Sequence, residues 1–392
     1  MRYLYHIILF VAALAYPATH LFAMETPPSE IAQAEAPNIA KEVAPVYVAL
    51  KKLRSHYEEI AKEGGWPHFN ATRGKIEPGA RDVRIKTVRE ILTVMGDYRN
   101  DDVVEPDHYD GVLEQAVMQF QLRHGLEQDG VIGRGTQKAL SVPVQTRIAQ
   151  IDATLKRMES FLPTSDRFIV VNLPEYMLRA YEHGQQVLDM RVIVGDKKNP
   201  TPRFDNEISY VSFNPPWGVP TRIATEELLP KIIEDPNYIA DHGYKVYYMR
   251  GEGSPEVNPD DVPWEHLNTD VKKFPYFLRQ QNSASSALGK IKFGMTNSDH
   301  IYLHDTPTRH LFKRDYRALS HGCVRVEKPR ELAHLIFKTA EDYDPETLNQ
   351  RYDGDKARIM KVEPLPVHLV YWTARADANG TAYFSEDIYK LD

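Results

Sequence analysis

The sequence contains a single cysteine, Cys323, in the run Ser320-His321-Gly322-Cys323-Val324-Arg325. A lone thiol has no disulfide partner within its own chain, so its presence needs another explanation. A thiol becomes a strong nucleophile when a nearby base or positive field converts it to a thiolate. The neighbouring residues therefore predict a nucleophilic cysteine, with an inert buried thiol as the alternative.

Two histidines are candidates for the base that activates this thiol. His304 ends a run of β-type sequence, Ile301-Tyr302-Leu303. His321 is two residues from the cysteine and is expected to point elsewhere. We therefore expect His304 to act as the general base.

The residues around the thiol suit acyl transfer. Gly322 allows backbone torsions that a side chain would forbid, so that main-chain N–H groups of the turn can form an oxyanion hole. Arg325 can stabilise a thiolate or bind a substrate carboxylate through two hydrogen bonds. Ser320 is expected to orient His321 or the turn by a hydrogen bond.

A metal site is the competing interpretation of this stretch, because zinc favours nitrogen and sulfur ligands. The residues concerned are His300, His304, His310, His321 and Cys323. Their spacings match none of the usual ligand pairs, so we expect neither a metal nor another cofactor.

Composition limits the other function classes. The chain has 392 residues, 42% hydrophobic and 26% charged, which is ordinary for a globular protein of two or three domains. Its formal net charge of −7 argues against a nucleic-acid partner, which would call for a basic face.

The N-terminal sequence predicts export. Residues 3–24 contain no Asp, Glu, Lys or Arg and include the apolar stretch 7–15, the pattern of a secretory signal peptide. An uncleaved membrane anchor is the alternative, but the purely apolar part is short for a span of about 20 residues. The following Pro-, Glu- and Ala-containing segment predicts a linker, and we expect a periplasmic, cell-wall-associated protein.

The first half of the mature chain has the periodicity of helices. Apolar residues recur every three or four positions over 46–61, and further helices are expected over 81–95, 111–124, from 135 and over 144–161. Residues 109–140 are similar to the small three-helix peptidoglycan-binding module found beside many cell-wall enzymes. For the individual residues of this segment, a purely structural role in the helical bundle remains the simpler interpretation.

The second half has the pattern of strands. β-type runs are expected at 168–172, 177–181, 187–194, 208–213, 291–293, 301–304 and 367–372. Their hairpin-length gaps favour a mixed or antiparallel sheet folded on itself over parallel βαβ units. An insertion over 217–288, with a helix at 225–234 and a strand at 244–249, is expected to act as a lid or as a brace against a neighbouring domain.

These residues resemble a known family. His304-Asp305-Thr306-Pro307, followed by Ser320 through Arg325, is similar to the signature of the L,D-transpeptidase (YkuD-type) catalytic domain. Five further phrases resemble the large periplasmic transpeptidases of the YcbB type: residues 64–67, 213–220, 287–293, 301–307 and 366–374.

The resemblance implies a multidomain α+β protein. It implies an N-terminal helical scaffold, a three-helix peptidoglycan-binding module, and a mixed β-sandwich catalytic domain of the YkuD type with an inserted lid subdomain. The expected segments are a signal peptide over 1–23, a linker over 24–45, a helical scaffold over 46–80, a peptidoglycan-binding-like domain over 81–142, a connecting helix over 143–165 and a catalytic domain over 166–392.

The resemblance also implies a reaction on peptidoglycan stem peptides. Cys323 would attack a donor tetrapeptide, release its terminal D-Ala and pass the acyl group to the amine of an acceptor stem, forming a 3→3 cross-link. His304 would be the base, steadied through Asp305, while Tyr302, Trp217 and Arg325 would line the pocket. Carbapenem-type inhibitors are expected to acylate Cys323.

Two other functions stay open at the sequence level. The same fold and cysteine could send the thioester to water, as an L,D-carboxypeptidase or a cross-link hydrolase. A non-catalytic, wall-binding structural protein is the alternative from another class, and the intact set of His304, Gly322, Cys323 and Arg325 argues against it.

Overall fold

The computed structural model describes residues 44–71, 74–99, 104–161, 163, 165–248, 253–283, 285–377 and 379–392. The predicted signal peptide and nearly all of the predicted linker lie outside these residues, as does Met249 at the end of a predicted strand. Within the described ranges, no helix has both the length and the apolar character that crossing a membrane requires.

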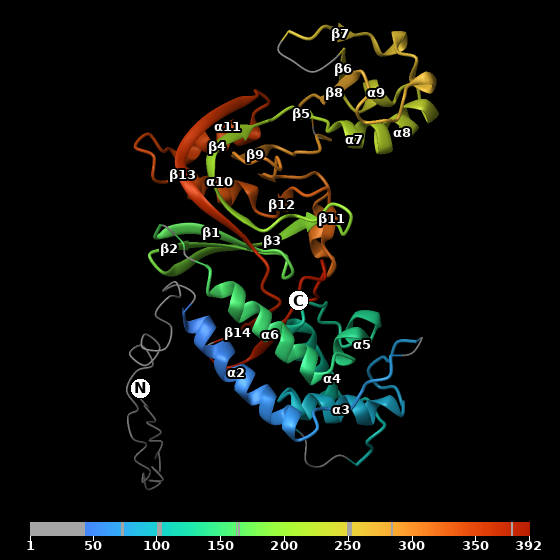
Figure 1. Cartoon of the computed structure of the whole chain (residues 1–392), viewed down its shortest axis with the longest axis vertical. Helices are drawn as coiled ribbons and strands as arrows, with labels where there is room; N and C mark the ends of the chain where they lie inside the picture. Colours follow the sequence, from blue (N-terminus) through green and yellow to red (C-terminus); the bar gives the residue numbers. More distant parts are fainter. Residues whose placement is uncertain are drawn as a thin grey trace, which may run out of the picture.

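A group of helices forms one end of the molecule (Figure 1). They are α2 (Ala44–Lys62), α3 (Arg84–Val94), α4 (Gly111–Arg123), α5 (Arg134–Leu140) and α6 (Val144–Met158). The helices predicted from periodicity are therefore confirmed, with ends shifted by a few residues. The spacing of apolar residues in α2 explains its burial, because Leu50, Leu53, Tyr57 and Ile60 all face the core.

The C-terminal hairpin belongs to this helical core, which the sequence pattern did not indicate. Strands β14 (Ala374–Ala376) and β15 (Ala382–Phe384) pair with each other and pack among the helices. The ring of Phe384 stacks on Tyr57 with 5.8 Å between centroids. The Arg147 guanidinium carbon lies 4.5 Å from the centroid of the same ring. The last part of the chain thus ties the helices to the strands that precede it.

The middle of the molecule is a β-barrel. Its strands are β1 (Arg167–Asn172), β2 (Met177–Glu182), β3 (Gln185–Gly195), β4 (Phe204–Phe213), β9 (Ile291–Met295), β10 (Leu303–His304), β12 (Val324–Val326) and β13 (Arg358–Val370). They follow the order β3-β12-β10-β9-β4-β13-β1-β2, and β2 pairs again with β3. A ninth strand, β11 (Ala318–Ser320), runs parallel to β3.

This closure corrects the expected β-sandwich, although the mixed strand directions are as expected. β13 pairs parallel with β1 and β10 with β12, whereas the other neighbours in the circuit are antiparallel. In a sandwich, β2 and β3 would be edge strands, each with one unpaired side. Here the long strand β3 binds β2 with one edge and β12 with the other, so that the sheet has no free edge there.

Helix α10 (Pro329–Phe337) contributes apolar side chains to the barrel core, and α11 (Pro345–Asp353) packs beside it. A short 3-10 turn, η4 (Arg309–Lys313), follows β10. These segments were not predicted as elements, because each is short and lies between strands.

The insertion forms a separate lobe at the far end of the barrel from the helices (Figure 1). It contains β5 (Trp217–Gly218), α7 (Thr221–Ile223), a π-helix η1 (Ala224–Leu228), α8 (Leu229–Glu234), α9 (Tyr238–Asp241), β6 (Tyr244–Tyr248), β7 (Glu256–Val257), η2 (Pro259–Asp261), η3 (Trp264–His266) and β8 (Tyr276–Gln280). Its strands form a sheet in the order β5-β8-β6-β7, and its apolar residues form their own core.

A buried ion pair inside the helical region generates a stability prediction. Arg123 and Asp97 form a salt bridge with side chains only 5% and 8% exposed, and Arg123 also donates to the Ala382 carbonyl oxygen of β15 at 3.2 Å. Replacing Arg123 by Met would leave the Asp97 carboxylate buried without a partner. We expect this change to lower the free energy of unfolding by roughly 3 to 5 kcal/mol, measured by urea denaturation.

The matched control is Arg54→Met, because the Arg54 side chain is 36% exposed in its pairs with Asp152 and Glu58. An exposed pair of this kind contributes less than about 1 kcal/mol. Equal losses for the two variants would contradict the importance of the buried pair.

Candidate functional site

The pairing of β10 with β12 brings the predicted site residues together. These strands run parallel, with Leu303 opposite Val324 and both side chains buried in the barrel core. Because side chains alternate along a strand, the residues before and after these two face the outside of the barrel. These outward residues are Tyr302, His304, Cys323 and Arg325.

His304 is held by its own neighbour in the chain. Its Nδ1 lies 2.6 Å from the main-chain carbonyl oxygen of Asp305, which can only accept, so Nδ1 carries the proton. Burial, together with the positive charges of Arg325 and Lys292, lowers the pKa of His304 to about 3. The ring is therefore neutral at neutral pH, and Nε2 keeps a lone pair that can accept a proton.

The Asp305 side chain supports the neighbouring turn. Its carboxylate accepts a hydrogen bond from the Lys290 amide at 2.9 Å and one from Arg309 at 3.0 Å. Gly289 has a φ of +59°, and a Cβ there would lie 2.4 Å from Asp305 Oδ2. The main chain of Asp305 thus orients the histidine, while its carboxylate fixes the loop before β9.

The Cys323 thiol is half-buried beside Tyr302. Burial raises the pKa of Cys323, whereas hydrogen bonds from Tyr302 and the charges of Lys292 and Arg325 lower it in part. Sγ donates to the His300 carbonyl oxygen at 3.7 Å. No hydrogen bond among the described residues joins this thiol to the His304 ring. The lowered pKa of His304 and the raised pKa of Cys323 make the resting pair a neutral imidazole and a thiol.

Short contacts fix the turn that carries the cysteine. Gly322 has a φ of +116°, in the region that favours glycine. The Ser320 hydroxyl donates to the Cys323 carbonyl oxygen at 2.5 Å and accepts from the Gly322 amide at 3.2 Å. Thr201 donates to the Gly322 carbonyl oxygen at 2.6 Å. The Gly322 amide, a predicted oxyanion donor, is therefore engaged by Ser320 in this structure.

Arg325 occupies the outer face directly opposite His304. Its guanidinium donates to Thr308 Oγ1 at 3.5 Å, while its buried Nε has no hydrogen-bond partner among the residues that the structure describes. Burial lowers the pKa of Arg325, although the group stays a cation at neutral pH. Arg325 therefore has hydrogen-bonding capacity left for a ligand.

The insertion contacts the site at two points, one in the cysteine turn and one at Tyr302. His321 Nε2 lies 2.5 Å from the carboxylate of Glu227 in the π-helix η1. Trp217, at the start of the insertion, makes a hydrogen bond with Tyr302, whose pKa is raised chiefly by burial and then by the nearby Cys323. Two predicted site residues therefore connect the site to the insertion: His321 contacts it, and Trp217 belongs to it.

Sequence reasoning missed three residues at this site. Lys292 of β9 pairs with His304, and its Nζ lies 4.0 Å from the Tyr302 ring centroid. The alternation of buried Ile291 and Phe293 around Lys292 was the available signal. Thr201 and Glu227 carried no such signal, because each meets the cysteine turn only through long-range folding.

Comparison with known proteins agrees with the motifs. Residues 166–344 match the family described as "L,D-transpeptidase catalytic domain", and residues 81–140 match "Putative peptidoglycan binding domain". A curated Haemophilus influenzae protein named "Putative L,D-transpeptidase" is 42% identical over 232 residues, covering 59% of this chain and 46% of that protein. The chain thus spans about half the length of this relative.

Solved structures show weaker likeness. An L,D-transpeptidase from Mycobacterium smegmatis is 14% identical, with a TM-score of 0.25 over 53% of this chain and 59% of that one. An L,D-transpeptidase from Xylanimonas cellulosilytica is 17% identical, with a TM-score of 0.22 over 77% of this chain and 100% of that one. At these scores the assignment depends on the sequence matches.

Those matches confirm the resemblance found in the motifs. Residues 166–344 belong to the L,D-transpeptidase catalytic domain family, and residues 81–140 belong to the family described as a peptidoglycan binding domain.

Proposed function

We propose that this protein is a peptidoglycan L,D-transpeptidase with Cys323 as its nucleophile and His304 as its general base. The observation that carries the proposal is the register of β10 and β12, which gives one outer face to a neutral histidine, a thiol and a guanidinium whose Nε has no partner among the described residues. The family match of residues 166–344 supports the reaction class.

The first half-reaction forms a thioester. His304 Nε2 accepts the thiol proton as Cys323 Sγ attacks the carbonyl carbon of the third residue of a donor tetrapeptide. The tetrahedral intermediate then collapses, and the C–N bond to the terminal D-Ala breaks. The imidazolium returns the proton to the departing amine, so that D-Ala leaves as a neutral amine and the ring is neutral again.

The second half-reaction transfers the acyl group. The amine on the third residue of an acceptor stem attacks the thioester and gives its proton to His304 Nε2. The C–S bond breaks, and the thiolate takes that proton back. The product is a 3→3 peptide cross-link, and Cys323 and His304 return to the thiol and neutral imidazole from which the reaction started.

Cations near the sulfur support the formation of a thiolate during this reaction. Arg325 and Lys292 both lower the pKa of Cys323. Arg325, with its unpartnered Nε, is suited to bind a donor carboxylate or to stabilise the thiolate. Tyr302 and Trp217 line the pocket, while Ser320 and His321 position the turn, the latter through Glu227.

The setting of the proposed reaction is the cell wall. The peptidoglycan-binding match over 81–140 supports binding of the sacculus next to the catalytic barrel. We propose that residues 24–45 separate the body from the membrane after export to the periplasm, and that carbapenem-type compounds acylate Cys323. The division into a helical scaffold over 46–80, a binding domain over 81–142, a connecting helix over 143–165 and a catalytic domain over 166–392 is part of the same proposal.

Product analysis tests the transpeptidase directly. The purified chain is incubated with disaccharide-tetrapeptide, and the products are weighed by mass spectrometry. We expect cross-linked dimers whose mass is that of two substrate molecules less one D-Ala. Cys323→Ala should abolish dimer formation, and His304→Gln should slow it by roughly 10² to 10⁴-fold, the usual range for loss of a general base. His310→Gln is the matched control, because His310 is exposed on η4.

Tripeptide monomers without dimers would instead identify the hydrolytic alternative. Dimers formed equally well by Cys323→Ala would contradict the proposed nucleophile.

The pKa directions predict an unusual pH profile for acylation by a carbapenem such as imipenem. His304, with a pKa of about 3, stays unprotonated well below the ordinary histidine range, so we expect the rate constant to be flat between about pH 4 and 8. Burial raises the pKa of Cys323, so spontaneous thiolate forms only at alkaline pH and the rate should rise there. A loss of rate on acidification through pH 6.5 would contradict a buried, neutral His304.

A further inference from the structure

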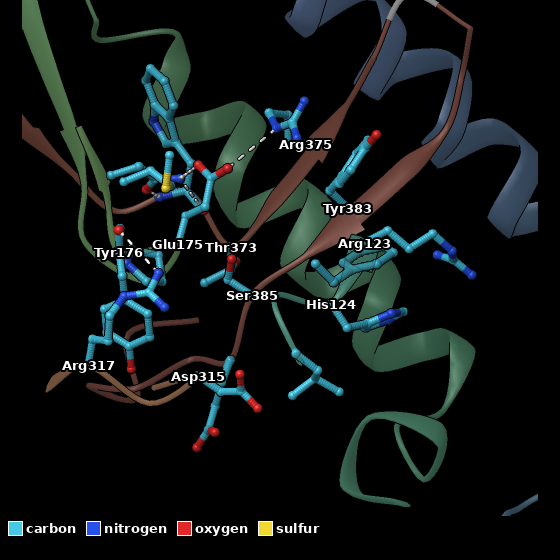
Figure 2. Close-up of a pocket in the computed structure, with 18 of the residues that line it drawn as sticks. Arg123, His124, Glu175, Tyr176, Asp315, Arg317, Thr373, Arg375, Tyr383 and Ser385 are labelled. Atoms are coloured by element: carbon cyan, nitrogen blue, oxygen red, sulfur yellow. Dashed lines mark hydrogen bonds and ion pairs between the residues drawn. The ribbon is translucent and has the colours of Figure 1, made fainter. Parts of the chain in front are cut away.

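A cavity of about 430 Å³ lies between the helical region and the barrel, away from the cysteine face. Its walls come from the end of α4, the turn between β1 and β2, the segment before β11 and the C-terminal hairpin. Figure 2 shows Tyr176 and Arg317 on one side and Tyr383 on the other, with Thr373 and Ser385 between them. Its volume falls in the usual range of small-molecule sites. None of the proposed catalytic or pocket residues lines this cavity.

Among the described residues, two guanidinium groups at the cavity have no carboxylate within hydrogen-bond distance. Arg317 is 9% exposed and donates to the carbonyl oxygens of Val192, Arg314 and Tyr176, at 3.3, 2.7 and 3.3 Å. Among the described residues, no carboxylate forms a salt bridge with Arg317. Each terminal nitrogen of a guanidinium carries two N–H groups, so Arg317 keeps further donors.

Arg375 is the second such group. Its Nε is 3.7 Å from Glu175, beyond hydrogen-bond distance, and Figure 2 marks this ion pair with a dashed line. Glu175 is already bound through both oxygens by Arg179, at 2.7 and 2.5 Å. The Arg375 Nε is buried without a partner in the described chain. The cavity therefore has more positive charge than its own carboxylates neutralise.

Other buried polar atoms at the cavity also lack partners. The Tyr176 hydroxyl and His124 Nε2 belong to lining residues that are 7% and 8% exposed, and neither atom has a hydrogen-bond partner within the described protein. The His124 Nδ1 proton goes to the Phe120 carbonyl oxygen at 2.8 Å, which leaves Nε2 as an acceptor. Buried polar atoms are nearly always paired, so these unpaired atoms at one cavity point to a ligand.

The carboxylates of Asp315 and Glu386 also line the cavity, and Glu386 is paired with Lys138. Aromatic side chains make up much of the remaining lining. Tyr316, Trp372, Tyr383 and Phe384 all contribute, and the Arg375 guanidinium lies 3.9 Å from the Tyr383 ring centroid. A small inorganic anion would contact the arginines but leave these rings without a partner. A short peptide that ends in or carries a carboxylate matches both features.

We propose that this cavity is a second, non-catalytic binding site for a carboxylate-bearing stem peptide of peptidoglycan. Arg375 binds the carboxylate, Arg317 adds positive charge, and the Tyr176 hydroxyl donates to the peptide. The identity of the ligand rests on the proposed function. Because one wall comes from α4, inside the peptidoglycan-binding match, and the other from the barrel, a bound strand would be held at the junction of the two domains.

Hydrogen–deuterium exchange on the full chain tests the site. The protein carries Cys323→Ala to prevent turnover, and the probe is disaccharide-tetrapeptide. We expect the ligand to protect backbone amides over 174–179 and 372–377. The affinity is obtained from the dependence of this protection on ligand concentration. Arg375→Gln is expected to lower it by roughly tenfold or more, because one hydrogen bond to a charged group contributes about that much to binding.

A second variant separates binding from folding. Tyr176→Phe removes only a hydroxyl that has no partner in the free protein, so it is expected to keep the urea midpoint and still weaken binding. The matched controls are Tyr248→Phe, a 49% exposed residue of the insertion, and Arg330→Gln, whose side chain is 37% exposed in a surface pair. Both controls should bind as the parent does.

Three results would overturn the proposal: no protection over these segments, protection that Arg375→Gln and Tyr176→Phe leave unchanged, or equal protection by the disaccharide without its peptide. Acylation of Cys323 in the otherwise unaltered chain is measured separately by mass spectrometry. Its absence would contradict the transpeptidase, whereas acylation without cavity protection would contradict the second site alone.

Discussion

The whole site depends on one pairing inside the barrel, the parallel register of β10 and β12. Burial of Leu303 and Val324 in the core fixes this register, because a slip by one residue would turn both apolar side chains out to solvent. The same constraint sends His304 and Arg325 to the outer face. The chemistry of the site is thus set by core packing on the opposite side of the strands.

Burial then sets the resting charges of the reacting pair. It lowers the pKa of His304 and raises that of Cys323, so the two residues rest as a neutral imidazole and a thiol and not as an ion pair. The Asp305 carbonyl fixes the tautomer that leaves Nε2 free to accept. The thiol donates to the His300 carbonyl oxygen in this state, so the proposed acyl transfer requires the sulfur and the imidazole to come into contact first.

Long-range contacts connect this face to the rest of the chain. Glu227 of the insertion holds His321 next to the nucleophile, and the C-terminal hairpin joins the barrel to the helical core. The insertion therefore contacts the cysteine turn directly, while the helical region contacts the barrel at the other end (Figure 1).

The sequence by itself determined the helices that precede the barrel, most strands and the family resemblance, and it predicted the thiol and its histidine, because periodicity and short motifs are local properties of the chain. It did not determine that the sheet closes, since the double pairing of β3 joins strands far apart in sequence, and the expected sandwich was wrong. Lys292, Thr201 and Glu227 entered the site, and Arg375 and Tyr176 came to share one cavity, only through tertiary structure. Burial, and with it the pKa of His304, is likewise a property of the folded chain, because desolvation depends on every segment packed around the ring.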